Sequence, residues 1–278
     1  MAQDTKQFAY ANTYQVVSPH TFLTTEKFNA KVFAGLIPDK RPMDNMAMGF
    51  KTPQEDEFGP ALLTGKSLYF GMSFPRHMQN YDRYLTFRDV PREEIEQWKA
   101  GLLWFLKKLT LKYNQRLVLK SPPHTARIKI LLELFPDAKF VHIHRNPYDV
   151  FQSFCHFHDT AVWYTYLQRP DLKAIPDQIL SRYTELYDAF FDDLPLIPEG
   201  HFHEIRYEDL ERDPIGQLRK TYAVLGLTDF SSFQPQLEKY VTSLNTYRKN
   251  SFNKLNTTER DRVSHQWMRS FEKWGYPV

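Results

Sequence analysis

Lys120, Ser121 and His124 lie close together, directly after a short apolar run of the sequence. Lys120 ends that run, and His124 falls one turn into the segment that follows. A cation and an imidazole beside a helix N-terminus suit an anionic ligand and a proton transfer. The alternative is a surface lysine with a histidine near a helix cap, and these residues alone leave both interpretations open.

Arg145 and Ser153 form a second candidate group around another apolar run, which Arg145 ends. Ser153 follows about two turns into the next predicted helix, so the pair can clasp a phosphate. The arginine would give a forked, charge-assisted hydrogen bond and the serine its hydroxyl. The alternative is a strand-end arginine paired with an acid such as Asp149.

Three acidic residues, Glu55, Asp56 and Glu57, stand together in the segment PQEDEF. Clustered carboxylates raise one another's pKa and can supply an acid or a base. The alternative is a solvated turn. The apolar neighbours Phe50 and Phe58 favour partial burial of the segment.

Two further patterns carry no ligand-binding motif. Gly65, Lys66 and Ser67 end like a phosphate-binding GxxxxGK[ST] loop, but position 60 is a proline instead of the first glycine, which predicts a turn. His142 and His144 alternate in a predicted strand and would face one side of the sheet as core or pocket residues. Their neighbours supply no set of carboxylates, so we expect no metal site.

The elements that position these residues follow from the apolar spacing. A long helix is predicted from Pro91 to about Lys112, with acids in its opening turns and lysines at its far end. Its buried face consists of Trp98, Leu102, Phe105, Leu106 and Leu109. Strands are predicted at 116–120, 139–145 and 201–207.

Each predicted strand leads into a helix. Ser121, Asn146 and Asp213 are placed to start these helices, and Gly226 is placed to end the last one. Strand–helix repetition predicts an α/β protein with a parallel sheet flanked by helices. Ligands bind such sheets at the carboxyl ends of the strands, here Lys120–Ser121, Arg145–Asn146 and Tyr207–Glu208.

Residues 1–90 are rich in proline, methionine and aromatic residues, and predict loops and short helices. We expect this region to shape an acceptor pocket over residues 91–278, which would form the nucleotide-binding core of a single domain. Its aromatic side chains suggest a partly apolar small-molecule acceptor. These aromatics are Tyr14, Phe22, Phe74, Tyr81 and Tyr84.

Composition excludes several classes of protein. The 278 residues carry a formal net charge of +3 without a block of basic residues, which argues against a nucleic-acid partner. The single cysteine, Cys155, allows no intramolecular disulfide and no cysteine-based zinc site. There is no apolar run of about 18 residues and no leader-like start, so we expect a cytoplasmic protein without stable membrane insertion.

Three stretches resemble the sulfotransferases that use 3′-phosphoadenosine 5′-phosphosulfate (PAPS), especially their bacterial branch. They are LVLKSPPHTAR (117–127), PDAKFVHIHRNPYDVFQS (136–153) and IRYEDLERDP (205–214). Stretches such as NTYQVVSPHTFL (12–23) and the terminal WGYPV are also similar, so the resemblance covers essentially the whole chain. It implies a sulfotransferase fold, related to that of the P-loop nucleotide hydrolases, and transfer of a sulfuryl group from PAPS to a hydroxyl or amine acceptor.

The resemblance also implies roles for individual residues. Arg145 and Ser153 match the clasp for the 3′-phosphate, and Tyr207 matches a tyrosine near the adenine. Lys120 matches a lysine near the transferred sulfuryl group, with His124 as the candidate base and Glu55 as its competitor. Three further residues resemble a basic loop over the 3′-phosphate: Arg248, Lys249 and Asn250.

One family element has no counterpart in this sequence. Relatives begin with a strand and a phosphosulfate-binding loop of the type RSGTT, and we expect both to be missing here. A chain without that cradle of backbone N–H groups is expected to transfer little sulfuryl by itself. The alternative function is therefore a non-catalytic nucleotide-binding protein or a truncated fragment. A kinase-like activity is disfavoured because no P-loop motif is present.

Overall fold

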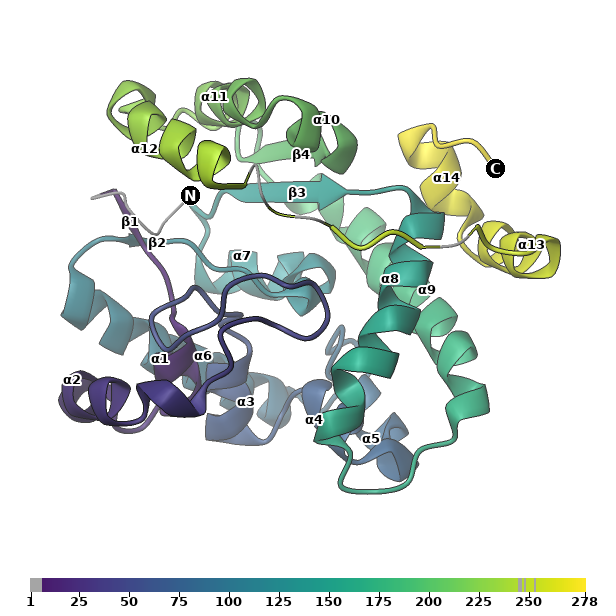
Figure 1. Ribbon diagram of the computed structural model, residues 1–278, viewed down its shortest axis with the longest axis horizontal. Helices are drawn as coiled ribbons and strands as arrows, with labels where there is room; N and C mark the ends of the chain where they lie inside the picture. Colours follow the sequence, from purple (N-terminus) through teal and green to yellow (C-terminus); the bar gives the residue numbers. More distant parts are fainter. Residues whose placement is uncertain (1–6, 245–246, 248, 253) are drawn as a thin grey trace. The chain divides into compact units, whose positions relative to one another are not determined.

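Short helices and long loops make up residues 7–90, which confirms the prediction for this described part of the region (Figure 1). The computed structural model describes residues 7–244, 247, 249–252 and 254–278. In this region the described elements are β1 (Phe8–Ala9), α1 (Thr13–Val17), α2 (Phe22–Val32), η1 (Ala34–Leu36), α3 (Phe58–Thr64), α4 (Tyr69–Ser73), η2 (Pro75–His77) and α5 (Gln79–Asp82).

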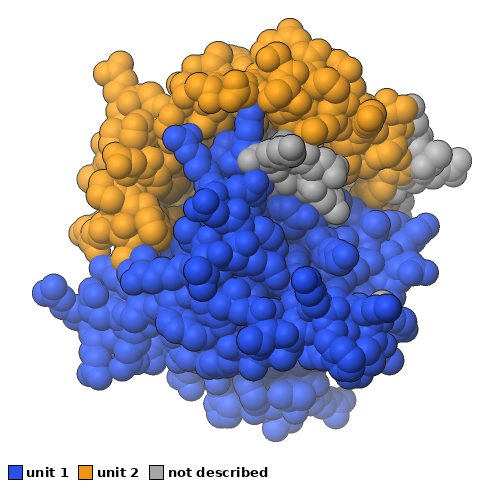
Figure 2. All heavy atoms as spheres, turned by 90° about the vertical axis from the view of Figure 1, so that its left-hand side faces the viewer, with its two compact units in different colours: residues 1–124, 165–170 blue, residues 125–164, 171–278 orange. Residues whose placement is uncertain are grey.

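The chain divides into two compact units (Figure 2). Unit 1 consists of residues 1–124 and 165–170, and unit 2 consists of residues 125–164 and 171–278. The long helix and Lys120 thus belong to unit 1, whereas the sequence groups them with the nucleotide-binding core. The single-domain organisation stays a prediction.

The long helix of unit 1, α6 (Arg92–Tyr113), agrees with the prediction to within a residue at each end. The apolar face expected from its spacing is buried throughout. Gly59 on α3 allows a close approach to this face, because a Cβ there would lie 3.0 Å from the Phe105 ring. The helix ends at Asn114, whose left-handed backbone closes the last turn.

The strand expected at 116–120 is shorter in the structure. Only β2 (Arg116–Leu117) forms, and it pairs in parallel with β1, a strand the sequence does not predict. The ladder stops early because the Lys120 N–H donates to the Asp56 carboxylate, 2.9 Å away, instead of to a neighbouring strand.

The prediction that Ser121 caps a helix is wrong. A 3₁₀ turn, η3 (Pro122–Ala126), follows it, and α7 (Ile128–Leu134) begins only afterwards. The Ser121 hydroxyl accepts the Glu57 N–H at 2.9 Å instead of a helix amide. A tertiary hydrogen bond has therefore replaced the local cap.

Unit 2 contains the two other predicted strands, β3 (Phe140–His144) and β4 (Phe202–Arg206). They pair in parallel from Phe140 opposite Phe202 to His144 opposite Arg206 (Figure 1). Among the described residues the strands form two separate two-stranded parallel sheets, instead of the one sheet expected. The α/β class is nevertheless as predicted.

Helices surround this strand pair, and their local start and stop signals behave as predicted. The Asn146 side chain caps α8 and the Asp213 side chain caps α11, while Gly226, with φ of 57°, follows the end of α11. The helices are α8 (Pro147–Thr160), α9 (Ile175–Asp193), α10 (Tyr207–Arg212), α11 (Pro214–Val224), α12 (Phe230–Ser243), α13 (Thr257–Gln266) and α14 (Met268–Trp274). Short 3₁₀ turns are η4 (Val162–Thr165), η5 (Leu172–Ala174) and η6 (Leu194–Leu196).

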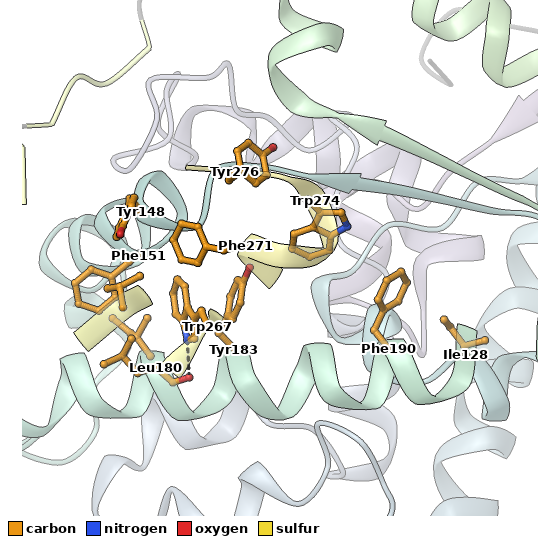
Figure 3. Close-up of a cluster of buried hydrophobic side chains, with 12 residues drawn as sticks. Ile128, Tyr148, Phe151, Leu180, Tyr183, Phe190, Trp267, Phe271, Trp274 and Tyr276 are labelled. Atoms are coloured by element: carbon orange, nitrogen blue, oxygen red, sulfur yellow. Dashed lines mark hydrogen bonds between the residues drawn. The ribbon is translucent and has the colours of Figure 1, made fainter. Parts of the chain in front are cut away.

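An aromatic cluster forms the core of unit 2 (Figure 3). At its centre the Trp267 ring stacks on Tyr183, with centroids 3.7 Å apart, and its indole N–H donates to the Leu180 carbonyl at 3.0 Å. These contacts tie α9 to α13 and α14. His142 and His144 are buried nearby, His144 stacking on Trp274 at 4.9 Å, so they are core residues, as the alternation predicts.

Burial of His158 on α8 makes stability depend on pH. Burial, and Arg182 beside it, lower the pKa of this imidazole to about 4, although Asp159 acts in the opposite direction. His158 in the unfolded chain binds a proton more tightly than in the folded protein. The contribution of neutral, buried His158 to stability is therefore complete above about pH 6.5 and is lost as the pH falls. Between about pH 7 and pH 4 the loss should reach about 3 kcal/mol.

We expect His158→Gln to remove this part of the pH dependence. Urea denaturation at both pH values measures it as a difference between variant and unaltered protein. His265→Gln on α13, which changes an exposed histidine, is the control and should leave the pH dependence intact. A His158→Gln protein with the same pH dependence as the unaltered one contradicts the assignment.

Among the described residues, no helix is both long enough and apolar enough to cross a bilayer.

Candidate active site

Glu55 and Lys120 meet in unit 1, as the sequence suggests for a common site. The Lys120 ammonium lies 2.6 Å from one Glu55 carboxylate oxygen, and the Tyr69 hydroxyl donates to the other. The Lys120 side chain is 70% exposed, whereas that of Glu55 is largely covered. The ammonium is therefore held at the surface by one carboxylate and remains accessible to an anion.

His124 pairs with Asp56 beside them. The His124 Nε2 atom lies 2.6 Å from an Asp56 carboxylate oxygen, and the Asp56 side chain is only 1% exposed. Burial alone would raise the pKa of Asp56, but His124 and the Lys120 N–H outweigh burial and lower it. An ionised carboxylate therefore holds the imidazole by one nitrogen, the arrangement that orients a histidine base.

The acidic segment is tied into the interior of unit 1. The Glu57 side chain accepts the Ser67 hydroxyl at 2.7 Å, and both residues are buried. The solvated-turn interpretation is thus wrong for Asp56 and Glu57. The Gly65–Ser67 segment is a turn, as predicted, because Gly65 ends α3 with φ of 71°.

Only two of the five aromatics expected to line an acceptor pocket are partly exposed. Phe74 and Tyr81 stack with centroids 6.2 Å apart near the surface. Tyr14, Phe22 and Tyr84 are instead buried in unit 1. Internal contacts explain this burial: for example, the Tyr14 hydroxyl accepts from Asn29 at 2.7 Å.

Arg145 directly follows β3 in unit 2, and its guanidinium lies 4.9 Å from the centroid of the Tyr207 ring. It contacts Asp149 at 3.3 Å, which is the alternative pairing considered from the sequence. Its Nε atom is buried and has no hydrogen-bond partner among the described residues. The side chain therefore keeps donor capacity for a ligand despite the pairing.

The other predicted nucleotide contacts are less closely associated. Ser153 is half-buried on α8, and the described structure shows no hydrogen bond between it and Arg145. Lys249 pairs with both Glu211 carboxylate oxygens at 2.8 Å, which raises the pKa of the lysine despite a smaller opposing effect of burial. Asn250 is half-buried, and Arg248 lies outside the described residues.

Glu208 is a structural residue of this cluster that the sequence marks only by its position after a strand. Its carboxylate accepts the Asn146 N–H at 3.1 Å and the Tyr276 hydroxyl at 2.9 Å. Burial would raise the pKa of Glu208, but these hydrogen bonds lower it overall. The turn between β3 and α8 is thereby fixed to the C-terminal segment.

Parallel strands that lead to cationic residues, with a capped helix after β3, define an α/β protein suited to anions. Residues 1–232 match the sequence model described as the sulfotransferase family. The chain belongs to this family. Because the family and its named relatives are sulfotransferases, the protein is a transferase.

Two relatives are named omega-hydroxy-beta-dihydromenaquinone-9 sulfotransferase, from Mycobacterium bovis and Mycobacterium tuberculosis. Each is 38% identical over 263 residues, which cover 95% of this chain and 67% of the relative. The relatives thus confirm the family resemblance and its bacterial branch.

Solved structures support the fold. A sulfotransferase from Mycobacterium avium aligns with a TM-score of 0.72 and 18% identity over 99% of this chain and 72% of its own. Another, from Mycobacterium tuberculosis, aligns with a TM-score of 0.60 and 16% identity over 95% and 67%. Both have the α/β sulfotransferase fold, which confirms the fold class.

Proposed function

We propose that the protein transfers a sulfuryl group from PAPS to the hydroxyl group of a small, partly apolar acceptor. Family membership supports sulfuryl transfer, and the partly unsatisfied Arg145 guanidinium at the end of β3 is the observation that carries the donor.

Arg145 would bind the 3′-phosphate through its guanidinium, as a charge-assisted pair. The N-terminus of α8 adds a favourable dipole for an anion at this point. Tyr207, whose ring already lies against the guanidinium, would contact the adenine. Ser153, Lys249 and Asn250 complete the proposed phosphate contacts.

His124 would act as the base of the transfer. The acceptor oxygen attacks sulfur, its proton passes to the imidazole, and the bond from sulfur to the bridging oxygen breaks to release adenosine 3′,5′-bisphosphate. Asp56 would stabilise the resulting imidazolium and hold its orientation. Lys120 would offset the negative charge that grows on the bridging oxygen, as cations do in phosphoryl transfer.

Glu55 is less suited to be the base, although it remains the competitor. Its carboxylate already accepts from the Lys120 ammonium and the Tyr69 hydroxyl. These bonds occupy both oxygens that would take the proton. Glu55 would therefore position Lys120 beside the sulfuryl group.

The acceptor class rests on the relatives. Their name specifies a hydroxyl group on a menaquinone, which is a hydroxyl on a largely apolar molecule. A similar acceptor for this chain agrees with the partly apolar small molecule expected from the sequence. A cytoplasmic location also stays a prediction.

Replacing Arg145 tests the donor assignment. We expect Arg145→Ala to weaken binding of adenosine 3′,5′-bisphosphate by roughly 1.5–3 kcal/mol, because a charge-assisted contact to the 3′-phosphate is lost. AMP, which lacks that phosphate, should bind the two proteins almost equally. Isothermal titration calorimetry measures both ligands.

Arg262→Ala is the matched control, because this exposed arginine of α13 also pairs with one carboxylate, that of Asp177. It should leave both affinities unchanged. If the unaltered protein binds AMP and the bisphosphate equally well, Arg145 does not recognise the 3′-phosphate.

A further inference from the structure

Helix α2 packs against the rest of unit 1 through polar residues. Glu26 accepts from Asn12 at 2.8 Å and from Gln15 at 3.0 Å, and it also pairs with Lys112. Asn29 donates to the Tyr14 hydroxyl at 2.7 Å. Phe22 is the only residue of this helix that is fully buried. The inward side of α2 is therefore held mainly by hydrogen bonds.

Next to this hydrogen-bonded side, α2 carries exposed apolar residues. Phe28 is 70% exposed, Val32 is 54% exposed, and Leu36, in the turn η1 that follows, is 77% exposed. Phe28 and Val32 are four residues apart, which places them in one stripe along the helix. A surface helix normally has the reverse arrangement, with apolar residues inward and polar residues outward. We use the name outer stripe of α2 for Phe28 and Val32 together with Leu36, the exposed apolar residue of the turn that follows the helix.

Lysines border this outer stripe. Lys27 and Lys31 are exposed and lie on the neighbouring side of the same helix, one residue before Phe28 and Val32. Within the described parts of the chain, neither lysine forms an ion pair. Glu26, the one acid of α2, is turned toward Asn12 and Gln15. The outward side of the helix is therefore both apolar and positively charged.

We propose that the outer stripe of α2 docks onto the surface of an anionic lipid bilayer. An apolar protein surface would cover the stripe but leave the lysines unmatched. A bilayer offers both partners together, because anionic headgroups lie directly above the acyl chains. The helix has 11 residues and is too short to span a bilayer, so it would lie in the interface.

Docking of this kind would bring the protein to apolar acceptors dissolved in the bilayer. That consequence rests on the proposed function, whereas the docking itself does not. Vesicle binding requires neither PAPS nor transfer, and bisphosphate binding requires no lipid. Failure of one can therefore be distinguished from failure of the other.

Co-sedimentation with lipid vesicles tests the proposal on the full chain. We expect binding to vesicles of phosphatidylcholine with about 30% phosphatidylglycerol, and much weaker binding to phosphatidylcholine alone. The double variant Phe28→Ser/Leu36→Ser should bind the anionic vesicles at least about 10-fold more weakly, because it removes two apolar side chains that would be buried in the bilayer. Lys27→Gln/Lys31→Gln should lose a similar factor and its salt dependence.

Leu111→Ser is the matched control, since Leu111 on α6 is also 77% exposed and belongs to the same unit. It should bind the vesicles like the unaltered protein. Circular dichroism checks that the variants are folded. Equal binding by the Phe28→Ser/Leu36→Ser variant and the control overturns the proposal. So does a protein that ignores vesicles but dimerises through Phe28 and Leu36, because a second copy then covers the stripe.

Discussion

Replacing His124 by alanine should lower kcat/KM for PAPS-dependent sulfation by about 10²-fold or more, the usual scale for loss of a general base. The reason is that the imidazole would take the acceptor's proton while Asp56 stabilises its charged form. Transfer of labelled sulfuryl from PAPS to a hydroxylated menaquinone is the measurement. If the 278-residue chain transfers sulfuryl too slowly to measure, the same variants are compared in a version that carries a phosphosulfate-binding loop.

Two further variants separate the possible bases. Asp56→Asn should reduce the rate less than His124→Ala and shift the pH dependence, because the imidazole is still present but loses its charged partner. Glu55→Gln should reduce the rate moderately by freeing Lys120. His265→Ala, an exposed histidine on α13, is the control. If Glu55→Gln abolishes turnover while His124→Ala barely changes it, Glu55 is the base.

Replacing Trp267 by alanine should destabilise the protein by about 3–5 kcal/mol, the range found for large aromatic residues removed from a core. Trp267 is almost completely buried, stacks on Tyr183 and donates to the Leu180 carbonyl. Its removal leaves a cavity between α9 and α13 and removes one of the hydrogen bonds to the Leu180 carbonyl, which keeps that from the Thr184 hydroxyl. Urea denaturation followed by circular dichroism measures the free energy of unfolding.

Trp163→Ala provides the control for this substitution. Trp163 in η4 is 58% exposed, so its loss should change the free energy of unfolding by about 0.5 kcal/mol or less. Similar values for the two tryptophan variants would show that the aromatic cluster is not the main source of stability in unit 2.

Much of the secondary structure follows from signals within a few residues. Apolar spacing predicts α6, and the side chains of Asn146 and Asp213 start α8 and α11 as expected. These signals are reliable because helix caps and helical faces depend on neighbours one or two turns away. The three apolar strands are recognisable for the same reason, although the first is shorter than predicted.

The candidate site is only partly predictable. Lys120, His124 and Glu55 each stand out by type and position, but the sequence does not pair His124 with Asp56, which lies 68 residues away. The chemistry of the cluster depends on that pair, since it orients the imidazole. Arg145 is likewise recognised at its strand end, with Asp149 as a possible partner, whereas its contact with the Tyr207 ring required the structure.

From the sequence alone come the family, helix α6, the strands β2 to β4 and the residue types at the strand ends, but neither β1 nor the turn after Ser121. Tertiary structure decided which of these residues meet: Asp56 with His124, Asn146 with Glu208, and the polar side of α2 with Asn12 and Gln15. The physical reason is that local signals act along a few residues of backbone. Hydrogen bonds between distant residues form only after packing has brought their elements together, so no local pattern encodes them.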